Sequence, residues 1–179
     1  MQGIATGALV QTCFGAGWLG WGMGVANAFS PATTVLFDAV LLVLIVGSVV
    51  LLKKGKAISR RAAPATPQEN RFGRSYWIVV VTEFVAIGVA VGLALAFHRA
   101  ESMPVGIAFI VGVHFLPLAR IFRAPIYYFT GSAVAAWSLG CWIMVSPARM
   151  AVWVGIGTGS ILWLSAAYAL LRAASLTAE

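Results

Sequence analysis

The sequence predicts an all-α fold, a polytopic membrane helix bundle formed by a single transmembrane domain over residues 1–179. Hydrophobic residues make up 61% of the chain and charged residues only 9%, against roughly 25% charged residues in soluble domains. Six apolar runs follow one another, each close to the about 20 residues that cross about 30 Å of hydrocarbon. The net charge of +7 would indicate nucleic acid in a soluble chain, but most of it falls in one loop, so we expect no nucleic-acid partner.

We expect six transmembrane helices at residues 4–28, 31–52, 76–97, 104–119, 125–145 and 148–171. Proline stands at or just before the start of four of them, at Pro31, Pro104, Pro125 and Pro147. A proline in the first helical turn costs little, because the N–H that it lacks would have no partner there. The first run ends in Ala26-Asn27-Ala28, which resembles a signal-peptidase site. No Lys or Arg precedes this long, glycine-rich run, so we interpret it as a retained helix.

Lysine and arginine are distributed unevenly between the two sides that alternating helices define. Ten of the twelve fall on the side of the N-terminus: Lys53, Lys54, Lys56, Arg60, Arg61, Arg71, Arg74, Arg120, Arg123 and Arg172. Only Arg99 and Arg149 fall on the other side. Cytoplasmic loops of membrane proteins carry an excess of Lys and Arg. We therefore expect a multi-pass protein of the cell inner (cytoplasmic) membrane, with the N-terminus and the C-terminus both cytoplasmic.

The most basic segment is the cytoplasmic loop predicted at residues 53–75. It contains the run Ala-Pro-Ala-Thr-Pro, which lacks the apolar residues needed to form a core. Its simplest interpretation is a topology determinant and a solvated linker. A compatible functional interpretation is attachment to anionic lipid headgroups, where each cation near the surface contributes about 1 kcal/mol. The residues that would make this contact are Lys53, Lys54, Lys56, Arg60 and Arg61.

Small residues recur at four-residue spacing within the predicted helices. The pairs are Gly20 with Gly24, Gly88 with Gly92, and Gly155 with Gly159. Small residues at this spacing let helix backbones approach closely, and such packing holds a bundle together in lipid. We interpret the pairs as helix-packing sites inside the bundle. The alternative, contact with a second copy or with another subunit of a membrane complex, stays open.

Scarce polar side chains recur at one depth in several helices. At about 1.5 Å per residue, Glu83, His114 and Gln11 each lie about 10 Å inside their runs from the N-terminal side. Ser132 in the fifth run reaches the same depth, whereas Asp38 in the second run lies about as deep from the opposite side. We therefore expect an inner polar layer and a single outer carboxylate. Such an arrangement would suit a substrate or proton path.

Glu83 and His114 are the two ionisable members of that layer. An isolated carboxylate is costly in hydrocarbon, but beside a histidine it could share or pass a proton near neutral pH. The alternative is that the two side chains hydrogen-bond only to hold their helices together, and equal depth does not determine whether they face each other. Pro117 removes one backbone hydrogen bond and leaves the carbonyl of Val113 without its helical partner, so we expect a helix kink there.

The sequence lacks the residues that metal-dependent or nucleophilic chemistry needs. The chain has two cysteines and two histidines, with no C-x-x-C and no H-x-x-x-H spacing, so we expect neither a metal nor another cofactor. Cys13 and Cys141 lie at different depths, which argues against a disulfide. Because the predicted helices contain no evident pair of nucleophile and base, we do not expect an enzyme.

One stretch carries a resemblance. His114-Phe-Leu-Pro-Leu-Ala119 is followed by Pro125, by Tyr127-Tyr128 and by Thr130-Gly131. With its length and span count, the chain resembles a family of small bacterial polytopic, about six-span membrane proteins of unknown function. Because that family has no established activity, the resemblance implies no substrate and no catalytic residue.

The leading hypothesis is a small integral membrane protein that works as a transporter or is channel-like, with the polar layer as its path. The alternative is a structural or accessory subunit of a larger membrane protein complex, or a homo-oligomer, in which the glycine faces pack against partners and the polar layer only maintains geometry. Three spans followed by three would give halves of opposite orientation. Whether these halves form an inverted repeat is open from the sequence.

Overall fold

A computed structural model of the chain describes residues 2–59 and 67–175, with side chains described for residues 6–53 and 73–175. The described residues form six α-helices, one short 3-10 helix and no strand, which confirms the expected all-α class. The helices are α1 (Gln2–Val25), α2 (Pro31–Ser59), α3 (Pro67–Ala96), α4 (Met103–Ile121), α5 (Ile126–Met144) and α6 (Pro147–Ser175), and the short helix is η1 (Ala100–Ser102).

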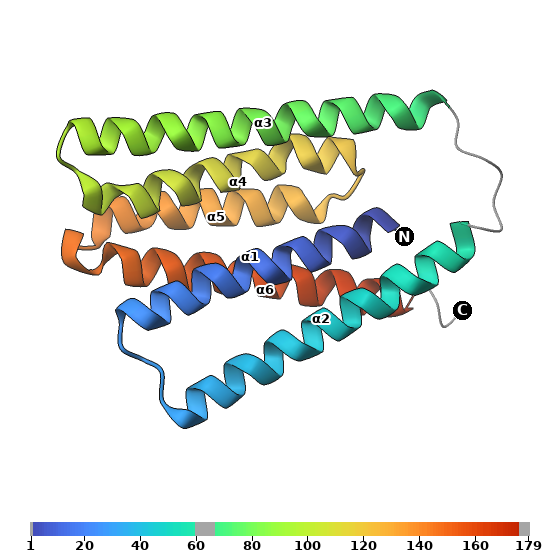
Figure 1. The fold of residues 1–179 in the computed structure, drawn as a ribbon, viewed down its shortest axis with the longest axis horizontal. Helices are drawn as coiled ribbons and strands as arrows, with labels where there is room; N and C mark the ends of the chain where they lie inside the picture. The colour runs from blue at the N-terminus through green and yellow to red at the C-terminus, as the bar shows by residue number, and fades with distance from the viewer. Residues whose placement is uncertain (1, 60–66, 176–179) are drawn as a thin grey trace.

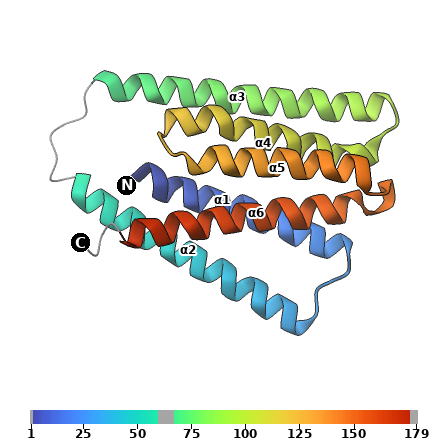
Figure 2. The ribbon, with the colours of Figure 1, turned by 180° about the vertical axis from the view of Figure 1, so that it is seen from behind.

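Consecutive helices run antiparallel along the long axis of the molecule (Figure 1). The start of α1, the α4–α5 connection and the end of α6 lie at one end, and Figure 2 shows the same arrangement from behind. The α1–α2, α3–α4 and α5–α6 connections lie at the opposite end. The two ends thus separate Arg123 and Arg172 from Arg99 and Arg149, as alternating helices require.

Four segments among the described residues are long and apolar enough to cross a membrane, not the six that the sequence predicts. They are Pro31–Lys53, Gly73–Ala96, Ala100–Ile121 and Pro147–Ser175. These segments correspond to the second, third, fourth and sixth predicted runs. The helices that fall short are α1 and α5. Both contain many glycine, serine, threonine, tyrosine and tryptophan residues, which are less apolar than the Val, Ile and Leu frequent in the four segments.

The helices on either side of the basic segment are longer than predicted. The loop predicted at residues 53–75 is shorter, because α2 continues to Ser59 and α3 already begins at Pro67. Lys, Ala, Gln, Glu and Arg are all favourable in helices, so an apolar helix can continue into a polar segment. The apolar parts still end at Lys53 and begin at Gly73, close to the predicted boundaries.

Three glycines hold two pairs of neighbouring helices at close distance. A Cβ atom on Gly155 of α6 would lie 2.8 Å from the Cα of Gly22 in α1, and one on Gly159 would lie 2.6 Å from the backbone N of Leu19. Between α4 and α5, a Cβ on Gly112 would lie 2.6 Å from the backbone N of Ala135. Because only glycine allows such approaches, these positions determine how closely the helix pairs pack.

The three predicted glycine pairs differ in their surroundings. Gly155 and Gly159 lie against the backbone of α1, whereas Gly20 faces only the ring of Phe37, 3.6 Å from where a Cβ would be. Around Gly24 the nearest atom, in Phe29, is 4.0 Å away. Gly88 and Gly92 have nothing within 4 Å among the described residues. Packing among the described residues therefore uses the pair in α6. The pair in α1 has only looser contacts, and the face of α3 that carries Gly88 and Gly92 is open.

Candidate functional site

A cavity of about 880 Å³ lies between α1, α3 and α4, with single residues of α5 and α6 completing its wall. Most of the lining is apolar. The polar groups in the wall are the side chains of Thr6, Gln11, Tyr76, Glu83, His114 and Tyr127. Mostly apolar cavities with a few convergent polar groups are the usual form of small-molecule sites.

Glu83 of α3 and His114 of α4 face each other in this cavity. The Nδ1 atom of His114 lies 3.2 Å from Oε2 of Glu83, and their side chains are 11% and 14% exposed. At this distance the two atoms are close enough for an ion pair, but their geometry does not meet the angular requirements of a hydrogen bond. The backbone of Val79, one turn before Glu83, also lies beside the ring.

The chain brings this pair together through a short connection. Only residues 97–102 separate α3 from α4, so the two helices are antiparallel neighbours and equal distances from their shared end become equal depths. Tyr76 precedes Glu83 by two helical turns and therefore lies on the same face of α3. It contributes to the same cavity wall.

A carboxyl group and an imidazole in contact can hold one proton between them or can bind a cationic group. A histidine offers one donor and one acceptor when neutral, and a carboxylate offers acceptors only. Among the described residues, no group of three or more His, Cys, Asp or Glu side chains could hold a metal ion. The contact between Glu83 and His114 itself supports proton exchange or recognition of a cation.

Gln11 lines the same cavity, but its amide binds Ser165 of α6, which is not among the lining residues. Its Nε2 donates to Oγ of Ser165 in α6 at 3.1 Å, and Ser165 Oγ lies 3.3 Å from its Oε1. Ser165 Oγ is also 2.6 Å from Oγ1 of Thr130 in α5. Sequence reasoning missed Ser165 and Thr130. The depth rule could have found Ser165, which lies seven residues before Arg172.

Asp38 and Ser132 do not join this site. Asp38 is exposed on α2, none of whose described side chains lines the cavity, and Ser132 is exposed on α5. Depth along a helix axis was their only link to the other polar residues, and depth does not determine which way a side chain points. A role for either residue in a path stays a prediction that the cavity does not support.

Pro117 lies inside α4, one turn after His114, and the helix continues through it to Ile121. Because proline has no N–H, the carbonyl of Val113 lacks its usual helical partner next to His114. The expected kink at Pro117 stays a prediction.

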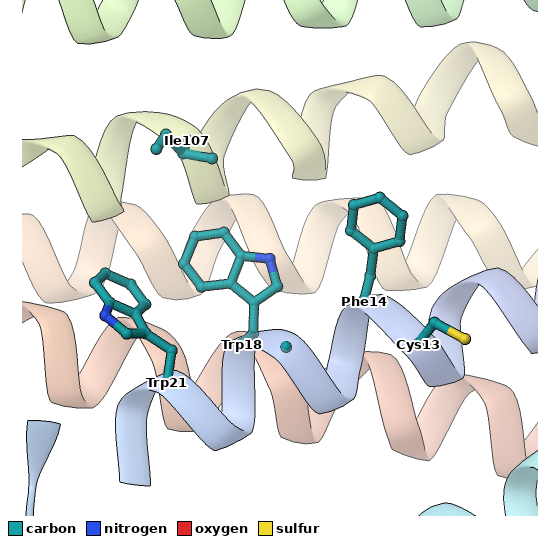
Figure 3. Close-up of a pocket in the computed structure, with 6 residues that line it drawn as sticks. Cys13, Phe14, Trp18, Trp21 and Ile107 are labelled. Carbon is teal, nitrogen blue, oxygen red and sulfur yellow. The ribbon is translucent and has the colours of Figure 1, made fainter. Parts of the chain in front are cut away.

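A second, more open hollow of about 510 Å³ continues the cavity along α1. Figure 3 shows Phe14 and Trp18 of α1 pointing toward the side of α4 that carries Ile107. These three residues line both spaces, so the two form one apolar surface. Gly17 and Trp21 belong to the hollow alone, together with the free thiol of Cys13.

Comparison with known proteins identifies a family that matches this chain, but no activity. The model of a family of unknown function, DUF7010, matches residues 16–172. No curated protein and no solved structure matches the chain. The matched region contains Glu83 and His114, and it extends far beyond the stretch from His114 to Gly131 on which the resemblance rests. The expectation of a family without an established activity is confirmed.

Proposed function

Because the chain belongs to DUF7010, a family of unknown function, we propose its role from the cavity: a small transporter or channel-like membrane protein whose path passes Glu83 and His114. The observation that carries this proposal is the 3.2 Å contact between the two side chains in the wall of a large apolar cavity. Ionisable residues inside membrane helices most often mark ion or proton paths. No catalysed reaction forms part of the proposal.

The proposal places all six helices across the cell inner membrane with both termini cytoplasmic. At about 1.5 Å per residue, α1 and α5 are about 36 Å and about 28 Å long, which suits a hydrocarbon core of about 30 Å. The end that carries most of the Lys and Arg would face the cytoplasm.

A topology experiment tests this orientation. A reporter inserted at Ser102 is expected to respond as exterior, and a reporter fused after Glu179 as cytoplasmic. The reverse pattern in an alkaline phosphatase and green fluorescent protein pair would show that the orientation is inverted.

The basic segment is proposed to bind anionic lipid headgroups at the cytoplasmic surface. Lys53 is exposed at the end of the apolar part of α2. The side chains of Lys54 and Lys56, and all of Arg60 and Arg61, lie outside the described residues. Support for this interaction therefore comes from charge and from the position of the segment next to an apolar helix.

Proton flux into proteoliposomes tests the path. With a membrane potential imposed and a pH dye inside, Glu83→Gln and His114→Ala are each expected to lower the flux at least about tenfold, because either change removes one of the two proton-holding groups. The matched control is Glu101→Gln, the same substitution at a residue of η1. The carboxylate of Glu101 lies 4.0 Å from Arg99, and Glu101 lines no part of the cavity. Unchanged flux in both cavity variants would remove the hypothesis.

An accessory subunit of a larger membrane complex is the second candidate. Two observations favour it: Gly88 and Gly92 leave an open face on α3, and the carboxylate of Asp38 is exposed on an apolar helix. Exposed polar groups and small-residue faces in lipid are places where another helix can pack.

A further inference from the structure

We propose that the cavity binds a lipophilic organic cation, an apolar molecule with a positively charged centre, which reaches Glu83 from the bilayer between α1 and α3. This inference rests on the proposed function and names its substrate class. It follows from the charges in the cavity wall, the composition of that wall and the position of its rim.

The charges in the wall select a cation. Glu83 contributes the one carboxyl group among the described lining residues, and none of these residues is Lys or Arg. A bound anion would lose its hydration beside a carboxylate without gaining a permanent positive charge. A bound cation gains a favourable interaction with Glu83, which is strong in an apolar surrounding.

The wall is also suited to the apolar body of such a molecule. Seven of the twenty-one lining residues are aromatic. Four rings form a continuous row: Tyr76 lies 5.9 Å from Phe122, Phe122 lies 6.1 Å from Tyr127, and Tyr127 lies 5.7 Å from Phe115. Faces of aromatic rings attract cations whose charge is only weakly hydrated. Glu83 and this row together therefore favour an organic cation over a hydrated metal ion.

The rim of the cavity lies where membrane lipid would touch the protein. Val10 and Phe14 on α1 and Phe84 on α3 line the cavity and are 44%, 55% and 63% exposed. Helix α1 packs mainly against α2 and α6 and makes no extensive contact with α3. The side of the bundle between α1 and α3 is therefore an apolar entrance, which the hollow along α1 extends (Figure 3).

Binding a cation beside Glu83 would displace a proton. With one proton on either the carboxyl group or the imidazole, the empty site carries no net charge. When the cation pairs with the carboxylate, that proton leaves to the solution, so that charge in the site is conserved. One proton released for each cation bound would couple this substrate to the proton path.

Tetraphenylphosphonium is a suitable probe, and triphenylphosphine oxide is its neutral analogue of similar shape. Binding is measured with the radiolabelled cation on the full chain in lipid nanodiscs, with empty nanodiscs as the blank. We expect saturable binding, weak competition by the neutral analogue, at least a tenfold loss of affinity in Glu83→Gln and no change in Glu101→Gln. Equal competition by the neutral analogue, or unchanged affinity in Glu83→Gln, would overturn the proposal.

A second variant tests the entrance without touching a charge. A Cβ on Gly17 would meet nothing within 4 Å, so Gly17→Leu adds bulk to the hollow without disturbing helix packing. We expect slower association of tetraphenylphosphonium at an unchanged unfolding temperature. An unchanged association rate would overturn entry by this side.

The two proposals fail in different ways. If tetraphenylphosphonium does not bind while the proton flux persists and depends on Glu83, the substrate class is wrong and the transport proposal stands. If the probe binds through Glu83 with release of a proton but the proteoliposomes show no flux, the binding site stands and the transport proposal fails.

Discussion

Leucine in place of Gly155 is expected to separate α1 from α6 and to leave little folded protein. A Cβ at this position would lie 2.8 Å from the Cα of Gly22 and 2.9 Å from the carbonyl oxygen of Trp18. Both are backbone atoms, which cannot rotate away as a flexible side chain can. Overpacking typically costs about 1–3 kcal/mol, and occasionally more. The measurement is the thermal unfolding temperature in detergent, followed by tryptophan fluorescence.

Gly88→Leu is the matched control for that variant. Nothing within 4 Å would meet a Cβ at Gly88, so the unfolding temperature should stay within error of the wild type. A similar loss of stability in both variants would contradict the assignment of Gly155 to the close helix contact. The control also tests the second candidate function, because an accessory subunit would lose its partners in Gly88→Leu while keeping its own fold.

Ser165→Ala is expected to destabilise the bundle by about 1–3 kcal/mol, the cost of leaving a buried polar group without a partner. The side chain of Gln11 is 1% exposed, and both ends of its amide depend on the hydroxyl of Ser165. Thr130 would be less affected, because its hydroxyl also donates to the carbonyl of Ile126 at 3.0 Å. The loss would appear as a lower midpoint of chemical unfolding in the same detergent.

The double variant Gln11→Met with Ser165→Ala provides the control for this network. Replacing both polar partners by apolar groups of similar shape is often nearly neutral. The double variant should therefore be more stable than Ser165→Ala alone. If instead the two substitutions destabilise additively, the hydrogen bonds between α1 and α6 do not contribute in the way that their distances indicate.

The contact between Glu83 and His114 illustrates how far counting along the chain can reach. Both residues lie about 10 Å from the same end of adjacent helices by residue number. A short connection makes α3 and α4 neighbours. Residues at similar depth in these two helices therefore lie close enough for their side chains to meet. Their 3.2 Å separation also required that both side chains point toward each other, which residue counts do not contain.

Counting placed Ser132 at the same depth as Glu83 and placed Asp38 alone on the opposite side, but it could not show that both side chains are exposed, on α5 and α2. It also missed Thr130, because a threonine can satisfy its hydroxyl within its own helix and therefore carries little signal in a sequence. The glycines of α1 that pack against α6 are Gly15 and Gly22. They lie seven residues apart rather than four. A search restricted to four-residue spacing could not find them.

The sequence by itself determined the all-α class, the positions of the helices to within a few residues at most ends, and the family of the chain. These follow from properties of consecutive residues: apolar length, prolines at helix starts and local matches. Only the tertiary structure decided which polar side chains meet. The rotation of each helix about its axis depends on close contacts such as Gly155 with Gly22, and these join residues far apart in the chain. That rotation turns Glu83, His114 and Gln11 into one cavity and leaves Asp38 outside it.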